Sequence, residues 1–258
     1  MIFETHAHIN SSRFDTDREE TISRIKAAGV DTLINVGDSI EGSKESVKLA
    51  MANDMIYAAV GIHPESAGSV PLDYIDILRD MASYEKVVAI GEIGLDYYWE
   101  ENPDADIQKK VFGGQLSLAR ELCMPVIIHS REACEDTFNI LRDYFGQIPV
   151  VYHCFSYSPE FAEQLVKYAD TYIGVGGVVT FKNAKKLVET VRRIPVDRIL
   201  LETDCPYMAP EPHRGKRNDS SYLPIIASKI AEIKDLSPEE VCGITHDTAG
   251  KIFMKKQN

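Results

Sequence analysis

Two histidines stand one residue apart near the start of the chain, where residues 3–8 read Phe-Glu-Thr-His-Ala-His. Side chains alternate between the two faces of a β-strand, so His6 and His8 would point the same way. Neutral imidazole is the commonest nitrogen ligand of divalent transition metals, and such a pair could share one ion. The spacing alone predicts little, because two histidines also meet by chance at a polar strand end.

Further histidines and carboxylates follow other apolar segments of the chain. They are His63, Glu92, His129, His153, Glu202 and Asp204. Counted with His6 and His8, five of the seven histidines in the chain lie at or just past the end of an apolar segment. Four imidazoles and two or three carboxylates are too many for one tetrahedral ion that must also hold water. They suit two ions about 3.5–4 Å apart, bridged by a carboxylate and a water or hydroxide.

These residue types predict a set of metal ligands and a general base. The expected ligands are His6, His8 and Asp204 on one ion, His129 and His153 on the other, and Glu92 between them. A metal pair of this kind lowers the pKa of the bridging water, so that hydroxide is available near about pH 7. Asp204 is the expected general base, because a carboxylate beside the water can take its proton. Glu202 is the second expected catalytic group, either as a residue that orients the ligands, which the sequence favours, or as a ligand itself.

Apolar, β-branched runs recur along the chain, and each is followed by a segment with helical spacing. Runs of this kind are typical of strands that are buried on both faces. The eight expected strands are residues 1–5, 32–36, 56–60, 87–91, 125–129, 149–153, 171–175 and 198–202. Eight strands alternating with helices predict an α/β fold, a (β/α)8 TIM barrel, as a single domain over residues 1–258.

The barrel also explains the positions of the candidate ligands. In this fold the chemistry lies at the carboxyl ends of the strands, and the candidate histidines and carboxylates fall at or just past those ends. An open, doubly wound sheet is the alternative, but it usually carries a glycine-rich phosphate loop after its first strand. Here His6, Ala7 and His8 occupy that place.

The helices that must hold these strands carry recognisable ends. Among those expected are helices over residues 106–122, 223–234 and 238–254. Ser237 followed by Pro238 is a clear start signal for the last of them. Gly113 and Gly114 weaken the first, since each glycine costs about 1 kcal/mol relative to alanine.

Charge and cysteine content exclude some classes of protein. The formal net charge is -12, which argues against a broad basic surface that coats nucleic acid but leaves room for a small phosphate site. The five cysteines are widely spaced without a C-x-x-C pair, so neither a disulfide framework nor a zinc knuckle is indicated. No signal peptide or membrane span is recognisable. We therefore expect a cytoplasmic protein, a monomer with no membrane association and no obligate protein partner.

The motifs taken together resemble the TatD family of metal-dependent deoxyribonucleases, within the amidohydrolase-like barrels. The resemblance covers essentially the whole chain. It rests on Phe3-Glu4-Thr5-His6-Ala7-His8, Gly61-Ile62-His63-Pro64, Ile90-Gly91-Glu92-Ile93-Gly94-Leu95-Asp96-Tyr97, Pro125-Val126-Ile127-Ile128-His129-Ser130-Arg131, His153-Cys154-Phe155-Ser156, Leu201-Glu202-Thr203-Asp204-Cys205-Pro206-Tyr207 and Pro212-His213-Arg214-Gly215-Lys216-Arg217-Asn218.

This resemblance implies a (β/α)8 barrel with two divalent cations that hydrolyses phosphodiester bonds, often as a 3′ to 5′ exonuclease on DNA. It places the metals on the ligands assigned above and makes His63, Arg131 and Arg214 phosphate contacts. A guanidinium matches the geometry of phosphate with two parallel hydrogen bonds, which agrees with the two arginines. The identity of the metal stays open among Zn, Mn, Mg and Ni, because histidine with carboxylate accepts each of them.

Two departures from the family pattern stand out. The family usually has Asp before the two histidines, whereas this chain has Glu4, whose longer side chain can change the support of the ligands. The family often has Glu-Pro after the Asn of the basic loop, whereas here residues 219–221 read Asp-Ser-Ser after Asn218. The contacts of that loop are therefore an open point.

Two other functions are compatible with the same fold. A hydrolase of small amides, lactones or phosphotriesters would share the barrel, but such relatives commonly bridge their metals with a modified lysine where this chain has Glu92. A non-catalytic barrel stabilised by metal is the third hypothesis. Asp204 together with Glu202 argues against it, because a structural site closes its coordination sphere and needs no spare base.

Several single residues allow two interpretations. Arg131 either binds phosphate or pairs with Glu92 or Asp96. The aromatic run at residues 97–99 either stacks on a base or packs against the barrel rim. His63 either caps a turn or joins the site, His213 either joins the phosphate loop or is a plain surface residue, and His246 is expected to be structural.

Overall fold

The structure is a computed structural model that describes residues 1–254. Eight parallel strands follow one another in the order β1 to β8 in one sheet, and helices alternate with them. This is the (β/α)8 barrel that the apolar runs predict. Within the described residues, no helix is long and apolar enough to cross a membrane.

Each expected strand is present, although the ends differ. The strands are β1 (Ile2–Ala7), β2 (Val30–Val36), β3 (Ile56–Val60), β4 (Val87–Asp96), β5 (Val126–Arg131), β6 (Val150–Tyr152), β7 (Thr171–Val175) and β8 (Ile199–Leu201). The largest difference is in β4, which the sequence pattern ends at residue 91. The expectation that Glu92 lies just past the strand is therefore wrong, because Glu92 lies inside β4. His129 likewise lies within β5, whereas His153 directly follows β6.

A close approach between two strands explains the extension of β4. Gly94 pairs with His129 of β5 and has φ 147°, a conformation that favours glycine. A Cβ atom at Gly94 would stand 1.9 Å from the His129 carbonyl oxygen, so no other residue fits there. Gly94 therefore lets β4 continue beside β5.

The helices fill the expected places between the strands. They are α1 (Arg18–Ala27), α2 (Ile40–Ala52), α3 (Tyr74–Ala82), α4 (Ala105–Glu121), α5 (Cys134–Leu141), α6 (Pro159–Leu165), α7 (Lys185–Arg193), α8 (Leu223–Lys234) and α9 (Pro238–Phe253), with short 3-10 turns η1 (Ser12–Phe14), η2 (Pro64–Ser69), η3 (Gly177–Thr180), η4 (Val196–Arg198) and η5 (Ser220–Tyr222). The start signal of α9 is confirmed, since Ser237 and Glu240 form a reciprocal capping box.

Helix α4 accommodates both of its glycines. A Cβ atom at Gly114 would stand 2.4 Å from the Tyr74 hydroxyl, so this glycine lets α4 pack closely on α3. Gly113 has nothing within 4 Å of such an atom, and nothing in the structure explains it.

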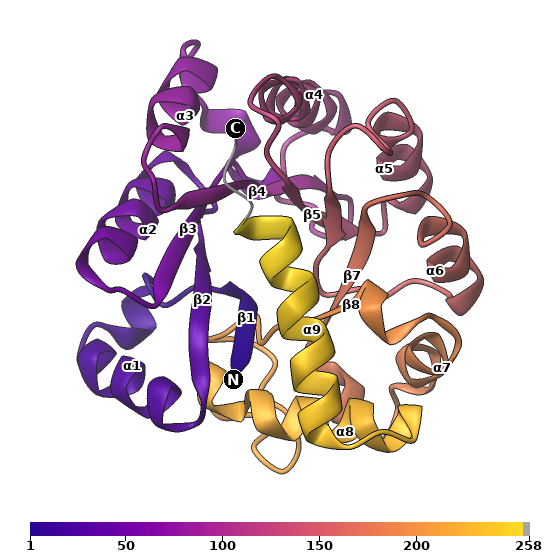
Figure 1. The fold of residues 1–258 in the computed structure, drawn as a ribbon. Helices are drawn as coiled ribbons and strands as arrows, with labels where there is room; N and C mark the ends of the chain where they lie inside the picture. The colour runs from indigo at the N-terminus through magenta and orange to yellow at the C-terminus, as the bar shows by residue number, and fades with distance from the viewer. Residues whose placement is uncertain (255–258) are drawn as a thin grey trace. The chain divides into compact units, whose positions relative to one another are not determined.

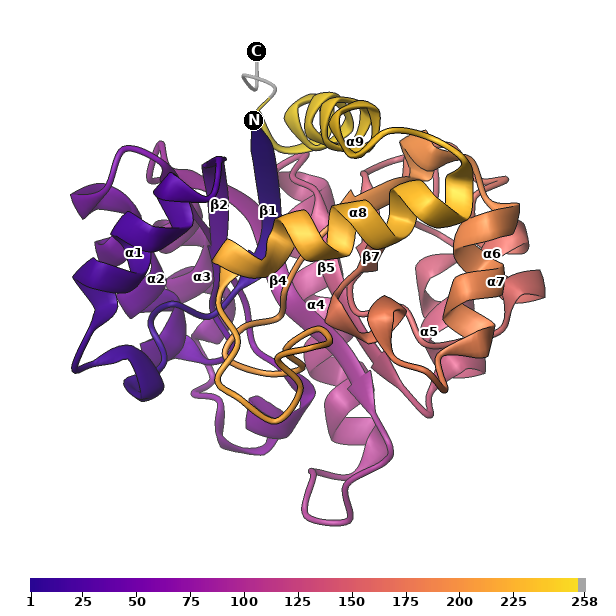
Figure 2. The ribbon, with the colours of Figure 1, turned by 90° about the horizontal axis from the view of Figure 1, so that it is seen from below.

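The chain forms two compact units, the first of which contains β1, β2, β7, β8, α1 and α6 to α9. In this unit Ala7, at the end of β1, forms a parallel bridge with Cys205, which follows β8. The first and last strands of the sheet therefore lie beside each other, as the closure of a barrel requires. Helix α9 packs on β1 and on α8 (Figure 1), and it lies beside the amino end of β1 (Figure 2).

The second unit contains β3 to β6 with α2 to α5. Its strands pair in parallel in chain order, and α2, α3 and α4 pack on β3 and β4 (Figure 1). Ile90 and Ile128 are completely buried in this core. Burial of a side chain of that size stabilises the fold by roughly 1.5–3 kcal/mol. This packing holds β4 and β5 as a rigid base for Glu92 and His129.

Candidate metal centre

The first unit brings together three of the expected ligands, His6, His8 and Asp204, which we name the first ligand group. The Nε2 atoms of His6 and His8 lie 3.1 Å apart. The Asp204 Oδ1 atom lies 3.7 Å from the His6 Nε2 atom and 3.5 Å from that of His8. The strand alternation expected for His6 and His8 therefore does direct both rings to one place.

The separations between these atoms fit a shared metal ion. Two ligand atoms that are each about 2.1 Å from zinc, at the tetrahedral angle, stand about 3.4 Å apart. The three separations in the first ligand group, 3.1, 3.5 and 3.7 Å, lie on either side of that value. Two ring nitrogens and a carboxylate oxygen are also a donor set that divalent transition metals accept.

Glu4 holds the first ligand group from behind. Its carboxylate is buried and accepts hydrogen bonds from the backbone N–H groups of His6, at 3.1 Å, and Thr203, at 3.0 Å. The Thr203 hydroxyl also donates to it, at 2.6 Å. Burial raises the pKa of Glu4 to about 7, although hydrogen bonds from Thr203 and Ser220 oppose this shift. The longer carboxylate at this position thus ties β1 to the segment that carries Asp204.

Asp204 lies in a strained turn that neighbouring groups stabilise. Its φ is 54°, a left-handed conformation that costs energy for a residue with a Cβ atom. Its backbone N–H donates to the His6 carbonyl at 3.0 Å, and the Asn218 side chain donates to the Thr203 carbonyl at 2.9 Å and to the Tyr207 carbonyl at 2.6 Å. Asn218 of the basic loop therefore clamps the turn that presents Asp204.

Glu202 is placed as a supporting group. It is buried, and its Oε1 atom accepts a hydrogen bond from the backbone N–H of Cys154 at 2.5 Å. A Cβ atom at Gly174 would stand 2.0 Å from the Glu202 Oε2 atom, so the glycine makes room for this carboxylate. Through its contact with Cys154, Glu202 holds the backbone that directly follows His153.

The second unit brings together His63, Glu92, His129 and His153, which we name the second ligand group. The Glu92 Oε1 atom lies 2.6 Å from the His153 Nε2 atom, 2.8 Å from the His129 Nδ1 atom and 3.7 Å from the His63 Nε2 atom. Three imidazoles thus converge on one carboxylate oxygen. The His129 Nδ1 and His153 Nε2 atoms are 3.3 Å apart, which again suits two ligands of one ion.

The charges in the second ligand group favour an ionised Glu92. Burial alone would raise the pKa of this carboxyl group, but the His153 ring and hydrogen bonds from His129 and His153 hold it well below its ordinary value. Glu92 is therefore a carboxylate that is available to a cation, not a neutral acid.

Asp96 also belongs to this site, although it is not among the ligands predicted from the sequence. Its Oδ2 atom lies 3.0 Å from the His129 Nε2 atom. Burial would lower the pKa of His129, but the Asp96 and Glu92 carboxylates outweigh burial and raise it to about 9. A ligating histidine usually donates its other ring nitrogen to a carboxylate, and Asp96 fits that role. Its even spacing from Glu92 is the signal in the sequence, because strand residues four apart share a face.

His63 caps a turn and also lies beside the other side chains of the second ligand group. Its Nδ1 atom accepts the Glu65 backbone N–H at 3.2 Å and so caps η2. Its ring also contacts the His129 ring, edge to face, with centroids 4.4 Å apart. Burial and the nearby His129 lower the pKa of His63 to about 3, so it is neutral. The Gln115 side chain fixes this position, because it bonds both the N–H and the carbonyl of Ile62.

The two candidate phosphate arginines are exposed and carry no ion pair within residues 1–254. The Arg131 Cζ atom lies 3.9 Å from the centroid of the Tyr98 ring, and that of Arg214 lies 4.4 Å from the Phe181 ring. The alternative that Arg131 pairs with Glu92 or Asp96 is therefore wrong, because stacking on Tyr98 holds its side chain instead. Arg217 differs from both, since it forms an ion pair with Asp17.

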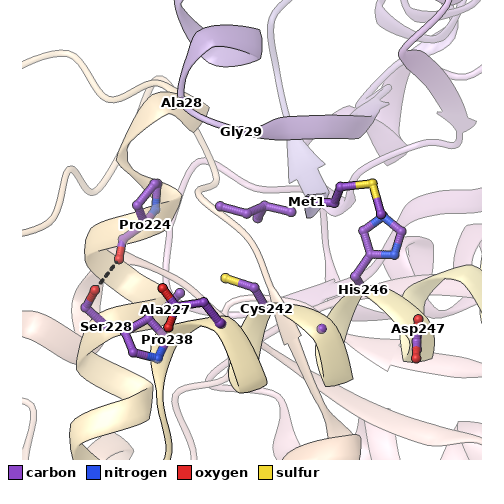
Figure 3. Close-up of a pocket in the computed structure, with 13 residues that line it drawn as sticks. Met1, Ala28, Gly29, Pro224, Ala227, Ser228, Pro238, Cys242, His246 and Asp247 are labelled. Atoms are coloured by element: carbon purple, nitrogen blue, oxygen red, sulfur yellow. Dashed lines mark hydrogen bonds between the residues drawn. The ribbon is translucent and has the colours of Figure 1, made fainter.

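A hollow of about 560 Å³ lies at the other end of the first unit, around Met1, Cys242 and His246 (Figure 3). Met1 and Ile2 of its lining precede or begin β1, so it opens at the amino end of that strand. Enzymes with this fold carry their chemistry at the carboxyl ends, so the hollow is not the site of the ligands. As expected, His246 has structural contacts there, 3.0 Å from Asp31 and against the Phe3 ring.

His213 and the aromatic run have partners in the structure. The His213 ring stacks on Tyr222 with centroids 4.3 Å apart, which favours packing within the first unit. The Tyr97 hydroxyl donates to the Asp136 carboxylate at 2.9 Å, so this tyrosine is tied to α5. Tyr98 and Trp99, in contrast, remain about half exposed.

Comparison with known proteins gives one consistent family. Residues 3–254 match the family described as TatD related DNase. YabD of Bacillus subtilis, named an uncharacterized metal-dependent hydrolase, is 44% identical over 98% of this chain and 99% of its own. The 3'-5' ssDNA/RNA exonuclease TatD of a Rahnella species is 33% identical over 98% of each chain.

Comparison with solved structures identifies the same family as comparison of the sequences. The crystal structure of YjjV, a TatD homologue from Escherichia coli K12, matches with a TM-score of 0.92 and 28% identity, over 99% of this chain and 98% of that one. The expected resemblance is therefore confirmed, and the chain belongs to the TatD family of metal-dependent hydrolases.

Proposed function

We propose that this hydrolase is a deoxyribonuclease that removes nucleotides from the 3′ end of DNA with the help of two divalent cations. The observation that carries the proposal is the convergence of three imidazoles on one oxygen of Glu92. A relative named as a 3'-5' ssDNA/RNA exonuclease supports the choice of substrate. The two exposed arginines, Arg131 and Arg214, support it as well, because neither forms an ion pair with any residue from 1 to 254.

The proposed ligands follow from the two groups. One ion is assigned to His6, His8 and Asp204, the other to His129 and His153, and Glu92 is assigned as the bridge. When bound, such cations withdraw charge from a phosphate and lower the pKa of water, which is the chemistry that this donor set fits. Zn, Mn, Mg and Ni all remain compatible with nitrogen and oxygen donors.

The side chains supply the remaining steps. Asp204 takes the proton of the attacking water as that oxygen forms a bond to phosphorus, and the bond from phosphorus to the leaving 3′ oxygen breaks. Glu202 acts with Asp204 by fixing the backbone after His153. Arg131 and Arg214 hold phosphate oxygens with their N–H groups, and neutral His63 can donate a hydrogen bond to one.

Three further predictions concern the protein as a whole. We propose that residues 1–258 act as a single hydrolase domain. From the sequence we also expect a cytoplasmic location and a monomer that needs no protein partner. Size-exclusion chromatography with light scattering checks the last point.

The test uses single-stranded DNA labelled at its 3′ or its 5′ end. Metal-stripped protein is resupplied with Mg, Mn or Zn and compared with Asp204→Asn, and Asp247→Asn serves as the control because Asp247 is an exposed carboxylate by the hollow. We expect metal-dependent stepwise loss of the 3′ label, and a rate lower by about 10²–10⁴-fold in Asp204→Asn only. Release of no nucleotide with any metal would contradict the proposal and favour the small-molecule hydrolase.

A further inference from the structure

Two neighbouring aromatic side chains of the second unit are exposed next to the second ligand group. Tyr98 and Trp99, in the segment between β4 and α4, are 46% and 52% exposed. Their rings meet edge to face, with centroids 4.8 Å apart and planes at 86°. About half of each side chain is therefore open to solvent, where a flat apolar group could cover it.

Arg131 braces this aromatic pair. Its Cζ atom lies 3.9 Å from the Tyr98 centroid and 5.3 Å from the Trp99 centroid, which is within the range of cation–π attraction. Stacking uses the flat face of the guanidinium, whereas its N–H groups lie in the plane and remain available. One side chain can thus orient the rings and bind a phosphate at the same time.

Asp96 ties the aromatic pair to the ligands. Its Oδ1 atom accepts the backbone N–H of Tyr98 at 2.9 Å, and its Oδ2 atom lies 3.0 Å from the His129 Nε2 atom. Gln108 bonds both the N–H and the carbonyl of Asp96, and Asn102 donates to the same carbonyl at 3.2 Å. One buried carboxylate therefore fixes the start of the aromatic segment and a proposed metal ligand together.

The charges around the pair favour a base over a phosphate. Glu100 and Glu101, both exposed, directly follow Trp99, so a phosphate placed beyond the rings would be repelled. An uncharged nucleobase meets no such penalty, and the N–H groups of Arg131 can bind its phosphate. The arrangement suits one terminal base rather than a long tract.

We propose that Tyr98 and Trp99, braced by Arg131, form a stacking site for one unpaired nucleobase of the substrate. This inference rests on the proposed nuclease function and specifies its substrate as a single-stranded or frayed end. A base inside a duplex has its faces covered by neighbours, whereas a base at a free end can stack on protein. Stacking of a base on an aromatic side chain is sequence-tolerant, so little preference among bases is expected.

The chain contains a single tryptophan, so Trp99 reports directly on the proposed contact. Metal-loaded wild-type protein is titrated with a short thymidine oligonucleotide whose phosphorothioate linkages resist cleavage. A matched oligonucleotide carries an abasic residue at its 3′ end, and the anisotropy of a 5′ dye measures binding independently. We expect quenching of the tryptophan emission by the intact oligonucleotide, almost none by the abasic one, and about tenfold weaker binding of the latter.

Substitutions test the same contact by kinetics. Tyr98→Ala and Trp99→Ala are expected to raise KM for unmodified DNA about tenfold each with little change in kcat, and to leave cleavage of the abasic substrate unchanged. Tyr98→Phe keeps the ring and is expected to behave as wild type. Tyr84→Ala, at an exposed tyrosine after α3, controls for a general effect of truncation.

The outcomes separate the two proposals. Cleavage of DNA with equal affinity for the intact and abasic oligonucleotides, or without quenching, would overturn the stacking site and leave the nuclease intact. Absence of both binding and cleavage of any nucleic acid would overturn the nuclease and the stacking site together. Equal loss of kcat on both substrates in the alanine variants would mean a structural role and would also overturn the stacking site.

Discussion

The two ligand groups differ in how their own carboxylates meet the imidazoles. In the second group the Glu92 Oε1 atom is 2.6 and 2.8 Å from two ring nitrogens, within the range of charge-assisted hydrogen bonds. In the first group the Asp204 Oδ1 atom is 3.5 and 3.7 Å from the rings, beyond that range. Hydrogen bonds can therefore hold Glu92 to His129 and His153 without a metal. The longer separations between Asp204 and the two rings of the first group suit ligands of a shared cation.

The carboxylates that support the two ligand groups, Glu4 and Asp96, also differ in what they contact. Backbone and hydroxyl donors surround Glu4 behind the first group, so its ligands are positioned by neutral contacts. Asp96 backs the second group with a further negative charge on His129. Loss of the supporting carboxylate should thus affect the second group, which Asp96 supports, more strongly than the first group, which Glu4 supports.

Among the substitutions of Glu92, Asp96 and Glu4, the largest effect is expected for Glu92→Gln. The amide keeps the shape but removes the charge on which three imidazoles converge, so we expect kcat to fall by at least about 10³-fold and metal content to drop. Steady-state kinetics and elemental analysis of the purified protein measure both. Glu121→Gln, on the surface beside Arg79, is the control and should keep full activity. Normal metal content and rate in Glu92→Gln would remove the basis for a bridging role.

A smaller effect is expected for Asp96→Asn. With the carboxylate present, His129 donates its Nε2–H to Asp96 and keeps Nδ1 for a metal; an asparagine amide can donate instead and favour the opposite tautomer. We expect a 10- to 100-fold loss of metal affinity, roughly the range known for such supporting groups. Titration of metal-stripped protein measures it, beside Asp143→Asn on the surface. Unchanged metal affinity would mean that Asp96 positions only the segment after β4, through the Tyr98 N–H, and does not support the metal ligand His129.

The sequence predicts the barrel and much of the centre because both depend on local pattern. Apolar runs mark strands buried on both faces, and alternation directs His6 and His8 together. The spacing of Asp96 from Glu92 becomes a signal only once β4 is known to extend to Asp96, and that extension depends on how closely Gly94 approaches His129, a contact between strands. The stacking of Arg131 on Tyr98 depends in the same way on residues that are far apart in the chain.

The smallest effect is expected for Glu4→Gln. Thr203 and the His6 backbone would still find one amide oxygen, so we expect a three- to tenfold loss of activity, roughly what a modest change in ligand support costs. Glu4→Ala should do more, since it leaves buried donors unsatisfied and destabilises the fold by about 1–3 kcal/mol. Urea unfolding and kinetics separate the two effects, with exposed Glu41→Gln as the control. A greater loss of activity in Glu4→Gln than in Asp96→Asn would mean that the supporting carboxylate matters more in the first ligand group than in the second, the opposite of what we expect.

The central claim is that each group holds one of two ions, and anomalous diffraction from crystals grown with zinc tests it most directly. The account predicts two peaks. One lies about 2.0–2.2 Å from the ligating atoms of His6, His8 and Asp204, the other at the same distance from those of His129 and His153, and Glu92 contacts both. A single peak, or one ion closed by four protein ligands with no place for water, would contradict it.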